Sequence, residues 1–245
     1  MNQSVQNASS QPIIQLNNVC KAYEDRAVLQ DISFSVKPGE ILAVIGPSGV
    51  GKSTILRLIS ELEPADKGEI ITTEKKIGMA FQYSALLNSY TVAENIAFAL
   101  HDSKFSEEEI AALVHETLDL VELDEFYDSM PDKLSGGQQK RVSFARAIIG
   151  NPKIILYDEP TAGLDPITST LIEDYILKLS KRLKAASIVV THQLSTIRRT
   201  ADRIICLFKG GIVWEGAVSQ LDTDQNEYIR QFIDGKPDGP FTSHH

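Results

Sequence analysis

The hydrophobic positions divide the chain into short apolar runs and longer segments with helical spacing. Residues 41–45, 154–157 and 188–190 are apolar without interruption, which is typical of strands covered on both faces in a parallel sheet. Between the last two runs the apolar residues recur at helical spacing, which predicts a strand–helix–strand unit. These residues are Leu171, Ile172, Tyr175, Ile176, Leu179 and Leu183. The pattern predicts an α/β fold.

Two further patterns lie at the ends of this core. Ile32, Phe34 and Val36 alternate with serines, which predicts a half-buried strand. Residues 204–208 and 212–214 flank a Lys-Gly-Gly sequence, which predicts a hairpin.

A helical pattern replaces the strands between about residues 83 and 147. Its main helix is predicted to begin at Ser106, because Glu109 follows with the spacing of a capping box. One apolar face comes next, formed by Ile110, Leu113, Val114, Thr117, Leu118 and Val121. We expect this region to form an α-helical lobe inserted into the α/β core.

The amino-acid composition indicates which class of protein this is. The 245 residues are 42% apolar and 23% charged, as in soluble globular proteins, and no apolar run is long enough to span a bilayer. Residues 1–12 are rich in Asn, Gln and Ser and predict a disordered lead-in. Cys20 and Cys206 are too few for a disulfide framework, and Cys206 is expected to be a buried thiol. We expect a cytoplasmic protein.

The net charge of −9 disfavours a protein that wraps a nucleic-acid backbone. Two basic clusters remain. The first predicts the solvated face of a helix and comprises Lys178, Lys181, Arg182 and Lys184. The second comprises Arg198, Arg199 and Arg203, which either are solvated or face an acidic partner or anionic lipid.

Residues 46–53 match the phosphate-binding pattern G-x-x-x-x-G-K-S, between an apolar strand and a helical segment. Glycines let backbone N–H groups surround phosphate oxygens, and the helix N-terminus adds positive partial charge. Lys52 is expected to reach the β- and γ-phosphates of ATP, and the Ser53 hydroxyl to bind Mg²⁺. The predicted nucleotide contacts are Gly46, Pro47, Ser48, Gly49, Val50, Gly51, Lys52, Ser53 and Thr54.

A pair of carboxylates ends the apolar run at residues 154–157. Asp158 is expected to bind Mg²⁺, through water in the usual arrangement. Glu159 follows it and precedes a proline, so we interpret it as the group that orients or deprotonates the attacking water.

Leu134-Ser135-Gly136-Gly137-Gln138 lies between these two motifs. The three elements in this order resemble the ATP-binding subunits of ABC transporters. The resemblance covers residues 14 to about 216 and implies a P-loop NTPase with a RecA-like core, a small antiparallel β lobe and an inserted helical lobe. We therefore expect an ATPase domain over residues 13–222 and a C-terminal extension over residues 223–245.

The resemblance also implies roles for residues outside the first two motifs. Tyr23 occupies the place of an aromatic that stacks on adenine, although one strand aromatic alone is weak evidence. Gln82 is similar to the glutamine that touches Mg²⁺, Asp165 to the aspartate of the D-loop, and His192 to the histidine that holds the γ-phosphate. Glu159, His192 and Gln82 are then the catalytic set, with Ser53, Gln82 and Asp158 at the metal.

In such proteins two subunits pack head to tail, and each signature segment closes over ATP bound to the other subunit. We expect Ser135, Gly136, Gly137 and Gln138 to bind that nucleotide at the start of a helix over residues 139–149. The resemblance implies a homodimer, or a heterodimer with a similar subunit.

Residues 81–98 and 230–241 are similar to the ATPases of the Mla (MCE-type) phospholipid transporters and their plastid relatives. This implies an MlaE-like membrane permease, an MlaD-like MCE lipid-binding subunit, with or without an MlaB-like STAS-domain subunit, at the inner face of the inner membrane. Tyr83, Leu86 and Leu87, near Gln82, form either a docking site for the permease or ordinary core. The alternatives are an importer ATPase for a polar solute, such as an amino acid or nitrate, and a soluble ABC ATPase in cluster assembly or DNA repair.

Overall fold

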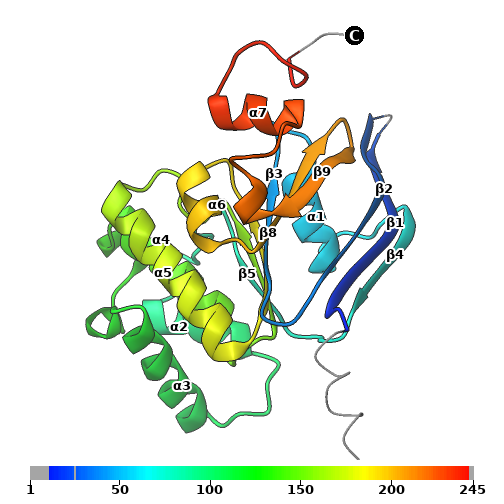
Figure 1. The fold of residues 1–245 in the computed structure, drawn as a ribbon. Coiled ribbons are helices and arrows are strands. Elements are labelled where there is room, and N and C mark those ends of the chain that lie inside the picture. Colours follow the sequence, from blue (N-terminus) through cyan, green and yellow to red (C-terminus); the bar gives the residue numbers. More distant parts are fainter. Residues whose placement is uncertain (1–10, 25, 243–245) are drawn as a thin grey trace, which may run out of the picture.

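The computed structural model describes residues 11–24 and 26–242 (Figure 1). Residues 1–10 of the expected lead-in lie outside this described part, and so do His244 and His245. Within it, two sheets and a helical lobe form the molecule.

The larger sheet is the predicted parallel core. In the described residues it has six strands in the order β5-β6-β7-β3-β8-β9, of which only β9 runs antiparallel to its neighbour. Every residue of β3, β6 and β7 is buried, as their uninterrupted apolar sequences require. The strands are β3 (Ile41–Ile45), β5 (Ile77–Ala80), β6 (Ile154–Asp158), β7 (Ala186–Val190), β8 (Arg203–Phe208) and β9 (Gly211–Ala217).

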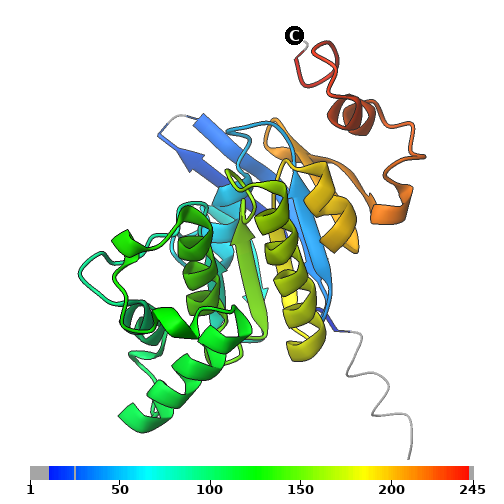
Figure 2. The same ribbon diagram turned by 90° about the vertical axis from the view of Figure 1, so that its left-hand side faces the viewer.

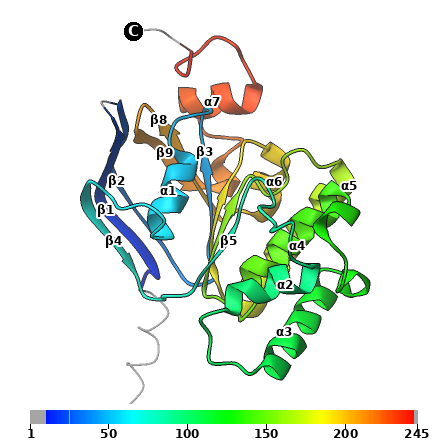
Figure 3. The ribbon, with the colours of Figure 1, turned by 180° about the vertical axis from the view of Figure 1, so that it is seen from behind.

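A smaller antiparallel sheet has the order β2-β1-β4 among the described residues. Its strands are β1 (Ile14–Tyr23), β2 (Arg26–Val36) and β4 (Lys67–Thr72). Figure 3 shows α1 (Lys52–Ile59) between this sheet and the central one. Ile55, Leu56 and Ile59 of α1 share one apolar core with buried residues of both sheets, so the helix joins them.

The helical lobe lies on the other side of the central sheet (Figure 2). It contains α2 (Val92–Ala97), α3 (Glu107–Leu120) and α4 (Gly136–Ile148), with single 3₁₀ turns at residues 98–100, 124–126 and 131–133. The Ser106 hydroxyl accepts the Glu109 N–H at 3.2 Å, and the Glu109 carboxylate accepts the Ser106 N–H at 2.7 Å. This capping box confirms the predicted start of α3.

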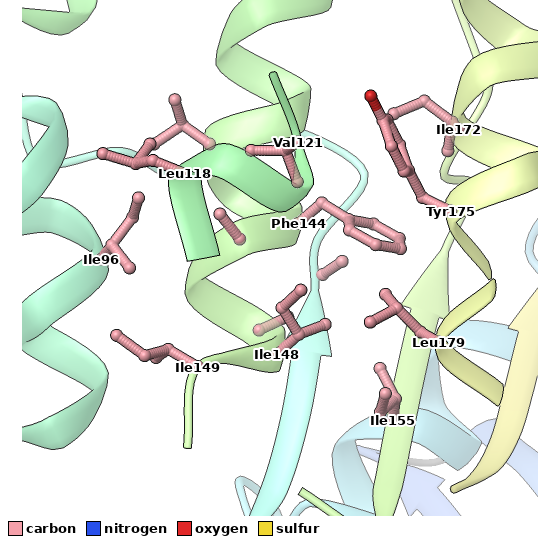
Figure 4. Packing of buried hydrophobic residues seen from close by; sticks show 14 of the residues in the cluster. Ile96, Leu118, Val121, Phe144, Ile148, Ile149, Ile155, Ile172, Tyr175 and Leu179 are labelled. Atoms are coloured by element: carbon pink, nitrogen blue, oxygen red, sulfur yellow. The ribbon is translucent and has the colours of Figure 1, made fainter. Parts of the chain in front are cut away.

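An apolar core fastens the lobe to the sheet (Figure 4). Phe144 of α4 stacks on Tyr157 of β6 with ring centroids 5.3 Å apart. The ring of Tyr175, on α5 (Pro166–Leu183), has its centroid 6.2 Å from that of Phe144. The lobe is therefore joined to β6 by close-packed side chains.

The C-terminal segment packs over β8 and β9, where α7 (Glu227–Asp234) lies in Figure 1. The rings of Phe208, Tyr228 and Phe241 lie 5.3 to 5.5 Å apart. The Gln231 side chain accepts the Phe241 N–H at 2.8 Å and donates to the Lys236 carbonyl at 3.1 Å. These contacts fold the residues after α7 back onto it. The remaining elements are α6 (Leu194–Thr200) and a 3₁₀ turn at Val218–Gln220.

The basic clusters lie on the surface. Lys178, Lys181, Arg182 and Lys184 are exposed, as predicted. The second cluster is paired within the chain: Arg198 with Asp222 at 2.6 Å, Arg199 with Asp174 at 2.6 Å, and Arg203 with Glu40 at 2.7 Å. Those charges are therefore already balanced without an acidic partner. Among the described residues, none of the helices combines the length and apolarity needed to cross a bilayer.

Candidate active site

The strand order brings distant sequence motifs to one edge of the central sheet. Gln82 follows β5, Asp158 ends β6, His192 follows β7, and the loop at residues 46–51 follows β3. These four strands are parallel neighbours, so their carboxyl ends meet. Such an edge of an open α/β sheet is the usual ligand site.

The loop at residues 46–51 requires glycine where it passes β8. Gly46 has φ 140°, and a Cβ there would lie 2.3 Å from the Leu207 carbonyl oxygen. The Lys52 ammonium donates to the carbonyls of Gly46 at 2.9 Å and Pro47 at 2.8 Å. Burial lowers the pKa of Lys52, while Glu159 and Asp158 oppose that shift. Among the described residues no side chain caps the first turn of α1, so its backbone N–H groups are suited to an anion.

The expected metal ligands Ser53 and Asp158 lie in direct contact. The Ser53 hydroxyl donates to Asp158 Oδ1 at 3.0 Å. Burial raises the pKa of Asp158, and the hydrogen bond from Ser53 opposes this shift. A buried carboxylate beside a hydroxyl is a donor set that hard cations such as Mg²⁺ prefer.

Glu159 is held in an unusual backbone conformation beside His192. Its φ is 48°, in the left-handed region that non-glycine residues rarely adopt, and its N–H donates to the Val190 carbonyl at 2.9 Å. Glu159 Oε1 lies 2.8 Å from His192 Nδ1. Glu159 Oε2 is buried and has no hydrogen-bond partner among the described residues. A buried oxygen of this kind calls for a ligand, a water or a cation.

Lys52, Ser53 and Glu159 line a cavity of about 450 Å³. Gln82 and Tyr23 line it together with Glu159 and His192, so the structure gathers motifs that lie far apart in the sequence. The Tyr23 hydroxyl donates to Glu63. The lining residues are Tyr23, Val28, Ser48, Gly49, Gly51, Lys52, Ser53, Thr54, Arg57, Gln82, Glu159, Val190 and His192.

The sequence did not single out Arg57 or Glu63. Arg57 lies one helical turn after Ser53, so the helical period of α1 was a usable signal. Its guanidinium lies 3.4 Å from the Glu63 carboxylate. Glu63 approaches Tyr23 only through the tertiary fold, and no local pattern indicated it.

The signature segment lies outside this cavity. Ser135 caps α4: its hydroxyl accepts the Gln138 N–H at 3.3 Å, and the Gln138 side chain accepts the Ser135 N–H at 2.8 Å. The helix therefore begins at Gly136, and not at residue 139 as predicted, because Ser135 and Gln138 form a capping box. Ser135, Gly136, Gly137 and Gln138 do not line the cavity that Glu159 and His192 line.

Asp165 is also apart from the cavity. Its carboxylate caps α5, accepting the N–H groups of Ile167 at 2.9 Å and Thr168 at 3.0 Å. A Cβ on Gly137 would lie 3.0 Å from the Thr168 methyl group, so the starts of α4 and α5 are close neighbours. The structure thus groups the signature segment with Asp165, away from the phosphate-binding loop of the same chain.

An apolar groove of about 380 Å³ lies between β5 and the helical lobe. Phe81, Leu87 and Phe98 line it, and these side chains are 37%, 37% and 51% exposed. Of the residues expected near a permease, only Leu87 lines this groove. Tyr83 is 80% exposed, and Leu86 packs against the core of the lobe.

Comparisons with known proteins agree on one family. Residues 29–162 match the family model described as ABC transporter. The chain is 42% identical to Protein TRIGALACTOSYLDIACYLGLYCEROL 3, chloroplastic, of Arabidopsis thaliana, over 94% of this chain and 76% of that protein. It is 36% identical to the spermidine/putrescine import ATP-binding protein PotA of Pasteurella multocida, over 95% of this chain and 65% of that protein. The chain thus spans less than two thirds of PotA.

Two solved structures are similar in fold and sequence. One is a dimeric, post-hydrolysis structure of the ATP-binding cassette MJ0796 bound to ADP and Pi, with TM-score 0.77 and 34% identity. The alignment covers 84% of this chain and 98% of that one. A second dimeric MJ0796 structure has TM-score 0.76 and the same identity and coverage. The expected P-loop ATPase fold is therefore confirmed.

Proposed function

We propose that this chain, which belongs to the ABC transporter family, powers phospholipid transport across the cell envelope through a membrane permease. The chain is an ABC-type ATPase subunit. The convergence of Lys52, Ser53, Glu159 and His192 on one cavity, with Asp158 hydrogen-bonded to Ser53, is the single observation that carries the ATPase assignment. The cargo and the partners are our proposals.

ATP hydrolysis follows from the charges around the cavity. The phosphate-binding loop and Lys52 hold the β- and γ-phosphates, because backbone N–H groups and an ammonium compensate their charge. Lys52 must then exchange its carbonyl partners in the loop for phosphate oxygens. Glu159 orients and deprotonates the attacking water, and His192 steadies both Glu159 and the γ-phosphate.

The residues fit a Mg²⁺ ion. The buried Asp158 carboxylate, the Ser53 hydroxyl and the Gln82 amide provide the oxygen donors. The ion supplies charge neutralisation at the β- and γ-phosphates when bound. Glu159 Oε2, buried without a hydrogen-bond partner in the described part of the chain, is then available to the attacking water.

We further propose a homodimer with ATP between the subunits. Each chain has one phosphate-binding loop and one signature segment, and the segment lies outside the cavity of its own chain. The N-terminus of α4 carries Ser135 and two glycines, which suits binding of a γ-phosphate on another chain. The similar MJ0796 structures are dimeric.

A lipid cargo is supported by the relative that is 42% identical, since it is named after trigalactosyldiacylglycerol, a lipid that shares its diacylglycerol part with phospholipids. The polar-solute import protein PotA is 36% identical. The C-terminal residues Arg230 to Phe241, which suggested this assignment in the sequence, form an ordered structure over β8 and β9.

The proposed partners are an MlaE-like permease, an MlaD-like MCE subunit and, in a larger assembly, an MlaB-like STAS-domain subunit. The apolar groove lined by Phe81, Leu87 and Phe98 is the proposed docking site for a cytoplasmic helix of the permease. The chain then lies on the cytoplasmic face of the inner membrane.

Purification of the intact complex from membranes tests the cargo. We expect a tagged full-length chain to copurify with a permease and bound phospholipid, and phospholipid to stimulate its ATPase activity. Complexes carrying Glu159→Gln serve as the matched control, because they keep the partners but lose turnover. A complex without lipid, stimulated instead by a soluble solute-binding protein, would overturn the lipid proposal.

The second candidate is import of a polar solute. It is supported by 36% identity to PotA over 95% of this chain. The same purification separates the two functions, because import of a polar solute requires solute-dependent stimulation and no bound lipid.

A further inference from the structure

Lys140 connects the signature helix to the catalytic loop of the same chain. It lies in the second turn of α4, which begins at Gly136. Its ammonium donates to the Ala162 carbonyl at 2.6 Å and to the Glu159 carbonyl at 3.4 Å. The side chain is half-buried, and its charge interacts with that of Glu159. The nucleotide chemistry described above gives Lys140 no role.

The loop that Lys140 holds is under backbone strain. Glu159 is a non-glycine residue with φ 48°. Such a conformation persists only where surrounding contacts determine it. Its carbonyl accepts the Ala162 N–H at 3.2 Å in addition to the Lys140 ammonium, so the loop is closed on itself and fastened to α4.

We propose that Lys140 is a positioning residue for Glu159: it ties the strained catalytic loop to the signature helix, so the water-activating carboxylate follows the position of that helix. The proposal rests on the proposed dimeric ATPase, in which the signature helix contacts ATP on the other subunit. Each ATP-binding half-site then influences the glutamate of the other site through a contact within one chain.

The charge of Lys140 suits this role, and its side chain is long enough to reach from α4 to the carbonyls of the catalytic loop. An ammonium donates several hydrogen bonds at once, so one side chain serves two carbonyls of a tight turn. A neutral apolar residue leaves the Ala162 carbonyl without this donor and releases Glu159 from α4. Lys140→Met is the test variant because it preserves the stem, and Lys140→Arg is the conservative variant because it restores charge and donors.

The first measurement separates kcat from KM for ATP in the full-length chain. We expect Lys140→Met to lower kcat by about tenfold or more, because a small displacement of a catalytic group has this effect, with KM changed less than about twofold. Lys140→Arg should recover most of the activity. Lys178→Met, at an exposed position on α5, is the matched control and should behave as the native chain.

Mixed dimers with two different tags locate the effect. One chain keeps Glu159 and the other carries Glu159→Gln, so only one glutamate is active. Lys140→Met should lower kcat when it is in the chain with the intact glutamate, and have little effect in the other chain. If Lys140 only shapes the signature segment, Lys140→Met should instead lower kcat when it is in the chain that carries Glu159→Gln.

An unchanged kcat in Lys140→Met, or an equal loss in both mixed dimers, would refute the proposal. A failure of the proposed function looks different, because the native chain would then lack ATPase activity or Glu159→Gln would not dimerise with ATP. Melting temperatures of the variants identify any that lose activity by unfolding.

Discussion

Gly46 occupies a position at which any side chain must displace the backbone of the phosphate-binding loop or of β8. A Cβ there would lie 2.3 Å from the Leu207 carbonyl oxygen. A carbon and a carbonyl oxygen in contact lie about 3.3 Å apart, so Gly46→Ala requires a shift of about 1 Å in the loop or in β8. Either shift moves backbone atoms and not a flexible side chain. The φ of 140° at Gly46 adds conformational strain for any other residue.

The magnitude follows from these two terms. We expect overpacking of about 1–3 kcal/mol and backbone strain of about 1–3 kcal/mol, giving a loss of about 2–6 kcal/mol in the free energy of unfolding. Because the displaced loop carries the N–H groups that bind phosphate, ATP affinity should fall by about tenfold or more. Gly39→Ala, outside the phosphate-binding loop, is the matched control: its φ is 77°, but its Cβ would meet nothing within 4 Å.

Urea denaturation and binding of a fluorescent ATP analogue measure the two effects. Gly39→Ala should lose only the cost of a left-handed residue, about 1–2 kcal/mol. Equal stability and equal affinity of the two variants would refute the steric reasoning, because only Gly46 faces the Leu207 carbonyl.

Three further predictions test the core, the metal site and the buried thiol. Phe144→Ala should lower the free energy of unfolding by about 3–5 kcal/mol, since this 2% exposed ring stacks on Tyr157. Phe105 is 44% exposed and serves as the control, so equal urea midpoints for Phe144→Ala and Phe105→Ala would contradict this packing role. Burial raises the pKa of Asp158, so protonation of this carboxyl stabilises the folded state at low pH, and this stabilisation is lost as the pH rises through that pKa. At pH 7 the buried charge destabilises the fold, so Asp158→Asn should melt at a higher temperature than the native chain while losing Mg²⁺-dependent hydrolysis. A lower melting temperature for Asp158→Asn would contradict this reasoning. Burial raises the pKa of Cys206 to about 12, so a thiol reagent should label Cys20 and spare Cys206 at pH 8 until urea unfolds the chain.

The core of the fold could be predicted because its signals are local. The uninterrupted apolar runs at residues 41–45 and 154–157 became the fully buried strands β3 and β6. The phosphate-binding loop likewise lies within one strand–loop–helix unit, so spacing alone indicated its place. The capping box at Ser106 fixed the start of α3.

Other features depend on tertiary contacts that a sequence pattern does not encode. Glu63 is 40 residues from Tyr23 along the chain, yet it accepts the tyrosine hydroxyl. The pairing of Arg198, Arg199 and Arg203 with acidic residues of the same chain was likewise invisible, because each partner lies on a separate element. The start of α4 was a different case: the Ser135 and Gln138 spacing was a readable signal that the glycines between them obscured.

The central claim is that one complete ATP site requires two copies of this chain. Glu159→Gln keeps the nucleotide contacts but removes the carboxylate that activates water, so bound ATP should hold the two subunits together. Light scattering after size-exclusion chromatography measures this directly. We predict twice the 27.0 kDa mass of the chain with ATP and Mg²⁺, and the single mass without nucleotide or in Lys52→Ala. A single mass for Glu159→Gln with saturating ATP would contradict the account.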